Sequence, residues 1–274
     1  MQEAVAGLIG KAAGAIPLED GDYYLDGLLY CGKCGTPKEK SMVFPWGPMI
    51  VRCLCRCRSE AYNREREDDA AKQRKIQAEI NRSLFPDKAM QTWTFSRDDR
   101  KNPALSDACW NYCLHFREMR KDGKGLLFFG PVGTGKTFFA TAIANELIDE
   151  GYRCFVTNFS RLCNRLSALR DRQAGIDDLN SYDLLVIDDL ASERNTEFMN
   201  ELVWNVIDSR YRAGLPIIIT TNLTREELKT TEIAQARIFS RLYEMCTFLT
   251  VDGADRRIGA MKKNQTEMMG LLGL

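Results

Sequence analysis

The sequence predicts an α/β fold in which a parallel, five-stranded sheet is flanked by helices. Over the second half of the chain, apolar segments of strand length alternate with helix-like segments, a pattern typical of parallel sheets covered by helices. The first strand also leads directly into a glycine-rich turn and a helix, which is the setting of a phosphate-binding loop. The expected strands are Gly125–Phe129, Arg153–Thr157, Leu184–Asp188, Pro216–Thr220 and Thr247–Val251, and the expected helices are Lys136–Glu150, Ser160–Leu169 and Glu197–Ala213.

The glycine-rich turn has the complete phosphate-binding pattern. Its glycines allow positive φ angles, so that backbone N–H groups face an anion, and the N-terminus of the next helix adds its positive dipole end. In such loops the lysine reaches the β- and γ-phosphates and the following hydroxyl ligates Mg²⁺. The sequence therefore predicts a nucleoside triphosphate site made by Gly130, Pro131, Val132, Gly133, Thr134, Gly135, Lys136 and Thr137.

Polar residues follow two later strands. Asp188 and Asp189 end one buried strand. There, one acid can hold Mg²⁺ through water and its neighbour can orient or deprotonate the attacking water. We assign Asp188 to the metal and Asp189 to water activation. Asn222 follows the next strand and is the candidate to position the water, because Thr224 is better suited to cap the helix that comes after it.

Two arginines lie one helical turn apart in the segment that precedes the last strand. Arg237 and Arg241 would place two positive charges on one helix face, where they could act on the γ-phosphate of a neighbouring subunit as an arginine finger. Surface ion pairs explain the same spacing equally well.

Composition limits the class of protein. The 274 residues contain 38 basic and 38 acidic side chains, so no overall basic field indicates nucleic-acid binding, and any such partner must be held by a local patch or at an oligomeric pore. No apolar run approaches the roughly 20 residues that cross a bilayer. Residues 1–16 lack the basic start of a signal peptide. We expect a cytoplasmic protein with no membrane partner.

The chain is expected to divide into three parts. Residues 1–58 hold a cluster of cysteines and turn-rich pieces, residues 59–90 form a charged helical linker, and residues 91–274 form the nucleotide-binding domain. Pairs such as Glu60 and Arg64 are four residues apart, which favours a solvated helix. Because acids and bases alternate there, an exposed helix explains the linker better than a nucleic-acid patch does.

Five of the ten cysteines lie in the first part, and their spacing predicts a structural zinc site. Two separated thiolate pairs meet the needs of a tetrahedral Zn²⁺ ion, and a small segment with little core gains its fold from the metal. We favour Cys31, Cys34, Cys55 and Cys57 as ligands, with Cys53 as a substitute. A redox Cys-x-x-Cys is the main alternative, but no strand-to-helix junction is visible there. Catalytic zinc is disfavoured because the single histidine, His115, is distant in sequence.

The ordered motifs GPVGTGKT, LLVIDDLASE, IIITTNLTREEL, RIFSRL and GADRR resemble those of AAA+ ATPases of the DnaC/DnaI helicase-loader group, whose close relatives are the IstB-type transposition helper ATPases. The resemblance covers about residues 93–263. It implies ATP with Mg²⁺, a Walker B pair at Asp188 and Asp189, and a sensor 1 at Asn222. It also implies an arginine finger at Arg237 and a sensor 2 at Arg257, with Arg256 as the less favoured choice. Many AAA+ proteins carry Asp-Glu where this chain has Asp-Asp, which puts the hydrolysis rate in question more than nucleotide binding.

The same resemblance implies partners. Loaders of this group bind a replicative DnaB-type helicase, for several members through an N-terminal zinc module, and hold single-stranded DNA in a channel of a self-oligomer. The positions that match the DNA contacts of the group are Thr196 and Phe198, although Phe198 serves equally well as a core residue. A transposition helper ATPase, a small-molecule P-loop kinase and a non-catalytic zinc adaptor are the alternatives. Trp93 either flanks the adenine or packs in the core.

Overall fold

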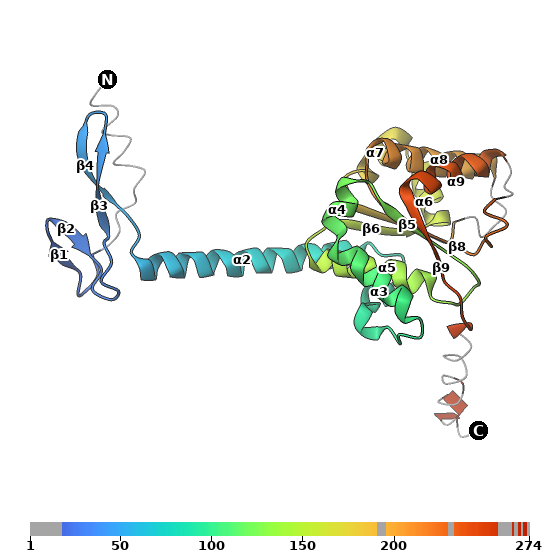
Figure 1. The fold of residues 1–274 in the computed structure, drawn as a ribbon, viewed down its shortest axis with the longest axis horizontal. Coiled ribbons are helices and arrows are strands. Elements are labelled where there is room, and N and C mark those ends of the chain that lie inside the picture. The colour runs from blue at the N-terminus through green and yellow to red at the C-terminus, as the bar shows by residue number, and fades with distance from the viewer. Residues whose placement is uncertain are drawn as a thin grey trace. The chain divides into compact units, whose positions relative to one another are not determined.

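The computed structural model describes residues 18–190, 196–229 and 233–256, together with residues 265, 268, 269, 271 and 272. The chain divides into two compact units, Met1–Gln73 and Arg74–Leu274. Figure 1 shows the elements of each unit. Within the described residues, no helix combines the length and apolar character that a membrane span requires.

The first unit contains two antiparallel hairpins. Strands β1 (Tyr23–Leu25) and β2 (Leu28–Tyr30) form one, and β3 (Glu39–Phe44) and β4 (Gly47–Arg52) form the other. The turn of the first hairpin is Asp26-Gly27, and both residues have positive φ angles, of 50° and 79°. Such angles suit a two-residue turn between twisted strands, and the Asp-Gly pair is a strong local signal for it.

The charged segment forms a long helix. The charged helical linker was predicted over residues 59–90, and α2 extends over 28 residues from Arg56 to Ser83. Its buried residues are Ala78 and Asn81, both near its C-terminal end. Solvent therefore surrounds most of the described helix, as its mixed charges indicate.

The second unit is built on a five-stranded parallel sheet with the order β6-β7-β8-β5-β9. The strands are β5 (Gly125–Phe129), β6 (Cys154–Asn158), β7 (Leu184–Asp188), β8 (Ile217–Thr221) and β9 (Cys246–Thr250). All five strands were predicted, and each lies within one residue of its expected bounds. The sheet confirms the predicted fold class.

Helices cover both faces of this sheet, because alternate residues of each central strand point to opposite sides. Leu127 and Ile187 belong to one hydrophobic core, whereas Phe128 and Val186 belong to the other. The first core lies against α6 (Phe159–Ser167), α7 (Arg172–Leu179), α8 (Glu197–Arg212) and α9 (Ile233–Met245). The second lies against α3 (Pro103–Leu114), α4 (Phe116–Lys121) and α5 (Lys136–Asp149). Helices α3, α4 and α7 were not predicted from the sequence.

A buried arginine joins the segments that lead into strands β7 and β8, at the amino ends of these strands. Arg210, in the last turn of α8, is fully buried. Its guanidinium donates to the carbonyl oxygens of Leu179, Tyr182 and Pro216, which lie in the segments that lead into β7 and β8. Burial lowers the pKa of Arg210 to about 10, so it remains charged at neutral pH. The carbonyls replace the water that the guanidinium loses on folding.

Replacing Arg210 with methionine should destabilise the second unit by about 3 kcal/mol, because several buried carbonyls would lose their donor. Chemical denaturation followed by tryptophan fluorescence would measure the change. The control is Arg212→Met on the same turn, where the side chain is 76% exposed and pairs only with Asp208 among described residues. Its loss should cost less than about 1 kcal/mol. Equal effects of the two substitutions would contradict a structural role for the buried guanidinium.

Candidate nucleotide site and cysteine cluster

The strand order brings the predicted site residues to one edge of the sheet. Strand β5, which precedes the glycine-rich loop, pairs with β8 on one side and β9 on the other, and β7 pairs with β8. Because the strands are parallel, their carboxyl ends lie side by side. The loop after β5, the acids after β7, the amide after β8 and the segment after β9 therefore surround one volume.

The glycines of the loop adopt conformations that other residues avoid. Gly130, Gly133 and Gly135 have φ angles of 134°, 80° and 108°. A Cβ atom at Gly133 would overlap the carboxylate of Asp255, and one at Gly130 would approach the backbone of Val251. The loop thus needs glycine both for its backbone angles and for close packing by the segment that follows β9.

Lys136 is the first residue of α5 and is buried. Its ammonium group donates to the carbonyl oxygens of Gly130 and Pro131, at 2.8 and 2.7 Å. These two bonds hold the positive charge against the loop, beside the N–H groups of the first turn of α5. The arrangement concentrates positive potential where a phosphate group would approach.

Thr137 and Asp188 lie together at the base of the site. Burial raises the pKa of Asp188, while hydrogen bonds from the hydroxyls of Thr220 and Thr137 oppose the rise. The Thr220 hydroxyl lies 2.6 Å from Asp188 Oδ1. A hydroxyl and a buried carboxylate side by side are hard oxygen ligands of the kind that Mg²⁺ prefers. The donor set therefore fits this ion.

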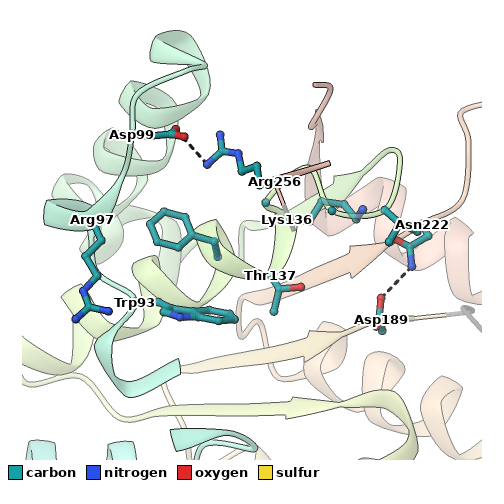
Figure 2. A pocket seen from close by; sticks show the side chains of 12 residues that line it. Trp93, Arg97, Asp99, Lys136, Thr137, Asp189, Asn222 and Arg256 are labelled. Carbon is teal, nitrogen blue, oxygen red and sulfur yellow. Dashed lines mark hydrogen bonds and ion pairs between the residues drawn. The ribbon is translucent and has the colours of Figure 1, made fainter. Parts of the chain in front are cut away.

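Asp189 and Asn222 face each other at the mouth of the site (Figure 2). The Asn222 amide donates to Asp189 Oδ1 at 3.1 Å. Asp189 is exposed and has a φ angle of 59°, unusual for a residue other than glycine. Its N–H donates to the Thr220 hydroxyl at 2.9 Å, which holds the backbone in this conformation. Thr224 exchanges hydrogen bonds with Glu227, but residues 225–229 form turns instead of the expected helix, so Asn222 caps no helix there.

A cavity of about 360 Å³, large enough for a small-molecule ligand, is bordered by Lys136, Thr137, Asp189 and Asn222. Its opposite wall is apolar and comes from Trp93, Val132 and Phe138. The rings of Trp93 and Phe138 lie 6.4 Å apart. Trp93, whose role the sequence left open, thus lines the cavity (Figure 2), as a residue flanking a base would.

An arginine reaches the cavity from the segment after β9. Arg256 lines it and pairs with Asp99, with 3.2 Å between Nη1 and Oδ1 (Figure 2). Its backbone N–H donates to the Gly133 carbonyl, so the segment is fastened to the phosphate-binding loop. The sequence favoured Arg257 for this position, and that residue lies outside the described ranges. The contribution of Asp99 was not predicted, because no local pattern marks it.

A buried amide fixes the apolar wall. Asn145 of α5 is fully buried and donates to the carbonyl oxygens of Met90 and Trp93, at 2.9 and 2.8 Å. Its own side-chain oxygen accepts from Arg82 at 3.0 Å, near the end of α2. The segment that carries Trp93 is thereby tied to the helix of the phosphate-binding loop. Asn145 also escaped prediction, since it lies within an ordinary helical pattern.

The two arginines of α9 have different surroundings. Arg241 lies 3.1 Å from Asp208 and 3.4 Å from Glu244, and its guanidinium carbon is 4.4 Å from the ring centre of Tyr211. Arg237 is exposed, and its guanidinium carbon lies 4.6 Å from the ring centre of Trp204. The surface ion-pair explanation thus applies to Arg241, whereas no ion pair of Arg237 occurs among the described residues.

The two predicted DNA-contacting residues begin α8. Thr196 caps this helix, and its hydroxyl accepts from the Met199 N–H at 3.2 Å. Phe198 is 42% exposed and therefore lies outside the core. The guanidinium carbon of Arg172 is 5.1 Å from its ring centre. A half-exposed ring with an arginine over it offers both a stacking surface and a positive charge.

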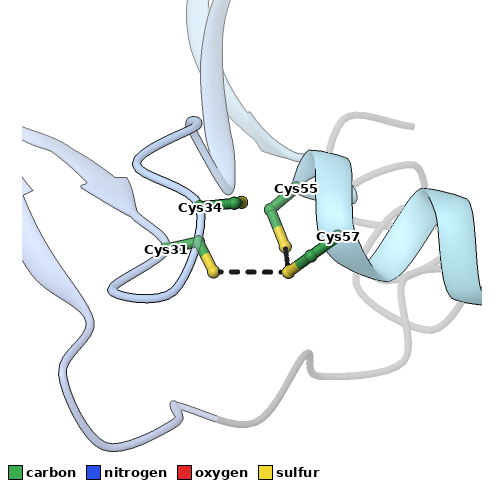
Figure 3. Close-up of side chains that lie close together, drawn as sticks. All are labelled: Cys31, Cys34, Cys55 and Cys57. Atoms are coloured by element: carbon green, nitrogen blue, oxygen red, sulfur yellow. Dashed lines mark hydrogen bonds between the residues drawn. The ribbon is translucent and has the colours of Figure 1, made fainter.

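In the first unit, four of the five clustered cysteines converge (Figure 3). All four sulfur atoms lie within 4.8 Å of one another, and they belong to Cys31, Cys34, Cys55 and Cys57. The Cys31–Cys57 and Cys55–Cys57 sulfur distances are 3.7 and 3.4 Å. A Zn–S bond of about 2.3 Å requires edges of roughly 3.8 Å in a sulfur tetrahedron. The cluster therefore fits a zinc ion.

The surroundings of the cluster support the same conclusion. The Thr36 hydroxyl lowers the pKa of Cys34 to about 5, and the neighbouring Cys55 raises the pKa of Cys57 to about 12. Neighbouring thiols with such divergent pKa values need a cation before all can be thiolates. Cys53 is not in the group, and its thiol instead faces the Pro37 carbonyl at 3.5 Å. The four cysteines that converge are those that the sequence analysis favoured, with Cys53 as the substitute.

The chain is similar to one described protein family and to several known proteins. Residues 63–264 match the family described as IstB-like ATP binding protein. The replicative helicase loader DnaI of Bacillus subtilis (strain 168) is 26% identical over 202 residues, which cover 68% of this chain and 65% of the relative. A putative insertion sequence ATP-binding protein of Sinorhizobium fredii (strain NBRC 101917 / NGR234) is 34% identical over 103 residues, covering 36% of this chain and 34% of the relative. The chain thus spans less than two thirds of either relative.

Among solved structures, the crystal structure of the DnaC helicase loader is similar, with a TM-score of 0.54 and 27% identity. The similarity covers 61% of this chain and all of the DnaC chain. It confirms that the predicted fold is of the AAA+ type.

We predict that the purified chain holds one zinc ion and that Cys34→Ser releases it, because only three thiolates would remain. Elemental analysis by mass spectrometry would measure the metal. Cys53→Ser is the matched control, since it removes a thiol of the same segment outside the cluster, and it should retain zinc. Loss of zinc from both variants, or from neither, would contradict the assignment.

Proposed function

The chain belongs to the family of IstB-like ATP-binding proteins, and on this basis we propose that it is an ATP-dependent loader that places a replicative DnaB-type helicase on single-stranded DNA. The observation that carries the proposal is the presence, in one chain, of a complete candidate nucleotide site and a separate four-cysteine cluster. A transposition helper ATPase would share the nucleotide site. The match to a loader over 68% of this chain and the cysteine unit favour the loader.

The proposed ATP site uses the residues at the carboxyl edge of the sheet. Backbone N–H groups of Gly130–Thr137 bind the phosphates, with the ammonium of Lys136 on the β- and γ-phosphates. Thr137 and Asp188 would hold Mg²⁺, which neutralises phosphate charge when bound. Trp93 and Phe138 flank the adenine. The cavity supports this arrangement because its polar and apolar walls face each other.

The proposed hydrolysis step depends on Asp189 and Asn222. Their side chains are hydrogen-bonded to each other at the exposed mouth of the cavity. The Asp189 carboxylate accepts a proton from the attacking water, while the Asn222 amide orients the same water. An aspartate reaches less far than a glutamate, so we expect slow turnover. Arg256 reaches the γ-phosphate from within the subunit, a role for which Arg257 remains the sequence-based alternative.

Arg237 is proposed to complete the site of a second copy of the chain. An arginine finger must be exposed and must keep its N–H donors available. Arg237 meets the first requirement, and its described neighbour is a ring rather than an acid. ATP would therefore be hydrolysed at contacts between copies, and assembly and turnover would be linked.

Single-stranded DNA is proposed to pass over the beginning of α8. Phe198 supplies a stacking surface, and Arg172 lies over its ring. Thr196 is available for a phosphate contact only through the hydroxyl that also caps α8. The zinc-bearing unit would bind the helicase, so that DNA and helicase are held by different parts of the chain.

Arg237→Ala should reduce kcat for ATP by about 10³-fold, the size of effect typical of an arginine finger, while ATP affinity is unchanged. A coupled ATPase assay with and without single-stranded DNA would measure this, and DNA should stimulate the unmodified chain. Arg241→Ala is the matched control on the same helix. Because that side chain is held by Asp208 and Glu244, its loss should affect stability more than turnover. Full activity of Arg237→Ala would reject action between subunits.

The helicase contact is tested by capture of a DnaB-type helicase on the immobilised full-length chain. Capture should occur with the unmodified chain and with Cys53→Ser, and it should fail with Cys34→Ser or after chelation, because the cysteine unit loses its metal. Helicase release should follow ATP hydrolysis in the presence of DNA. Failure of the unmodified chain to capture helicase, together with capture of an insertion-sequence transposase, would favour the transposition function instead.

A further inference from the structure

We propose that Trp204 is a positioning residue for Arg237, and that it holds the guanidinium ready for the nucleotide of a second copy. The inference rests on the proposed function, because it requires Arg237 to act between subunits. It adds a residue that no sequence motif marks, since Trp204 lies in the middle of α8 and away from the nucleotide cavity.

The contact joins two helices that pack together. Trp204 of α8 is half-buried and packs against the hydrophobic core. The guanidinium carbon of Arg237, on α9, lies 4.6 Å from the centre of the Trp204 ring. Such a distance is within the range of a cation–π contact, for which tryptophan is the best partner. The ring is thus a fixed platform, and the arginine is the exposed group upon it.

Arg241 provides a comparison one helical turn away. Its guanidinium donates to Asp208 and Glu244, at 3.1 and 3.4 Å. It also lies over Tyr211, with 4.4 Å to the ring centre, whereas its distance to the centre of the Trp204 ring is 5.8 Å, longer than the 4.6 Å of Arg237. Asp208 is shared with Arg212 at 2.7 Å, so this acid is already engaged twice. Carboxylates accept the N–H donors of Arg241 and thereby commit them within the subunit.

A ring holds an arginine differently from a carboxylate. Contact with the ring face requires no hydrogen-bond acceptor, and none of the described residues accepts from the five N–H donors of Arg237, which can therefore serve an anion. At the same time the contact restricts a long side chain that would otherwise sample many rotamers. Trp204 therefore limits the motion of Arg237 without neutralising it or occupying its donors. An acid in the same place would compete directly with a phosphate.

The first test compares Trp204→Leu with Trp204→Phe in the full-length chain. Leucine keeps an apolar group but removes the ring, so kcat in the assembled state should fall about threefold to tenfold, with ATP affinity unchanged. Phenylalanine restores a ring and should recover most of the activity. Tyr211→Leu is the matched control, because it removes the ring under Arg241 and should leave kcat within about twofold of the unmodified value.

The second test places the substitution in one subunit of a mixed assembly. Donor subunits carry Lys136→Ala and cannot use their own nucleotide, whereas acceptor subunits carry Arg237→Ala and cannot supply the finger. Activity of the mixture then arises from the donor's Arg237 at the acceptor's ATP. Trp204→Leu should reduce this activity when it is placed in the donor and should have no effect in the acceptor. Trp204→Met replaces it if the leucine variant unfolds at a lower temperature than the parent.

The outcomes separate the inference from the proposed function. No activity in the mixture with unmodified Trp204, together with full activity of Arg237→Ala alone, rejects action between subunits. An active mixture that is insensitive to Trp204→Leu or Trp204→Met in the donor overturns only the role of Trp204. The same holds if the loss is equal in donor and acceptor, because that result indicates a general structural effect.

Discussion

The contact between the carboxyl ends of β7 and β8 determines the geometry of the site. Main-chain pairing of the two strands extends to Ile187 and Ile219. Beyond this pair, the hydroxyl of Thr220 connects the two chain segments by hydrogen bonds. That hydroxyl donates to Asp188 Oδ1 and accepts from the Asp189 N–H, while the Leu190 N–H donates to the Thr220 carbonyl. One threonine thus sets the metal-side acid and the water-side acid relative to each other. Its bond from the Asp189 N–H is one of the contacts that hold Asp189 at a positive φ angle.

The opposite side of the cavity is held by quite different means. Trp93 and Asp99, on this side, precede the sheet in sequence and contribute no strand to it, so packing and side-chain hydrogen bonds must hold them. Asn145 satisfies the carbonyls of Met90 and Trp93 from within the helix of the phosphate-binding loop. The Asp99–Arg256 pair joins the same wall to the segment after β9. One side of the cavity is therefore formed by the ends of paired strands, and the other side is held by a few polar contacts. Any opening of the cavity should occur on the side that carries Trp93 and Asp99.

How far the sequence could predict the molecule depended on whether the signal was local. The strands and the phosphate-binding loop were predictable because apolar runs and glycines carry their own conformational preferences. The Asp26-Gly27 hairpin was predictable in the same way, although its turn pair was overlooked. Asp99 and Asn145 were not predictable, because their partners are distant in sequence and polar residues of the same types occur on many exposed helices. For the cysteines, the sequence favoured Cys55 over Cys53, and the structure adds that the Cys53 thiol faces the Pro37 carbonyl instead of the cluster.

The buried guanidinium of Arg210 has a consequence for how the second unit comes apart. Its hydrogen bonds end on the segment before β7 and the segment before β8, so they all exist only while both segments are in place. If the last turn of α8 opened alone, three buried carbonyls would lose the guanidinium as a donor, which makes such partial opening costly. The helix end and the two central strands should therefore exchange their amide hydrogens as one cooperative unit, although they are separate in the chain. The buried Arg210 thus identifies a part of the second unit that should not open independently of the rest.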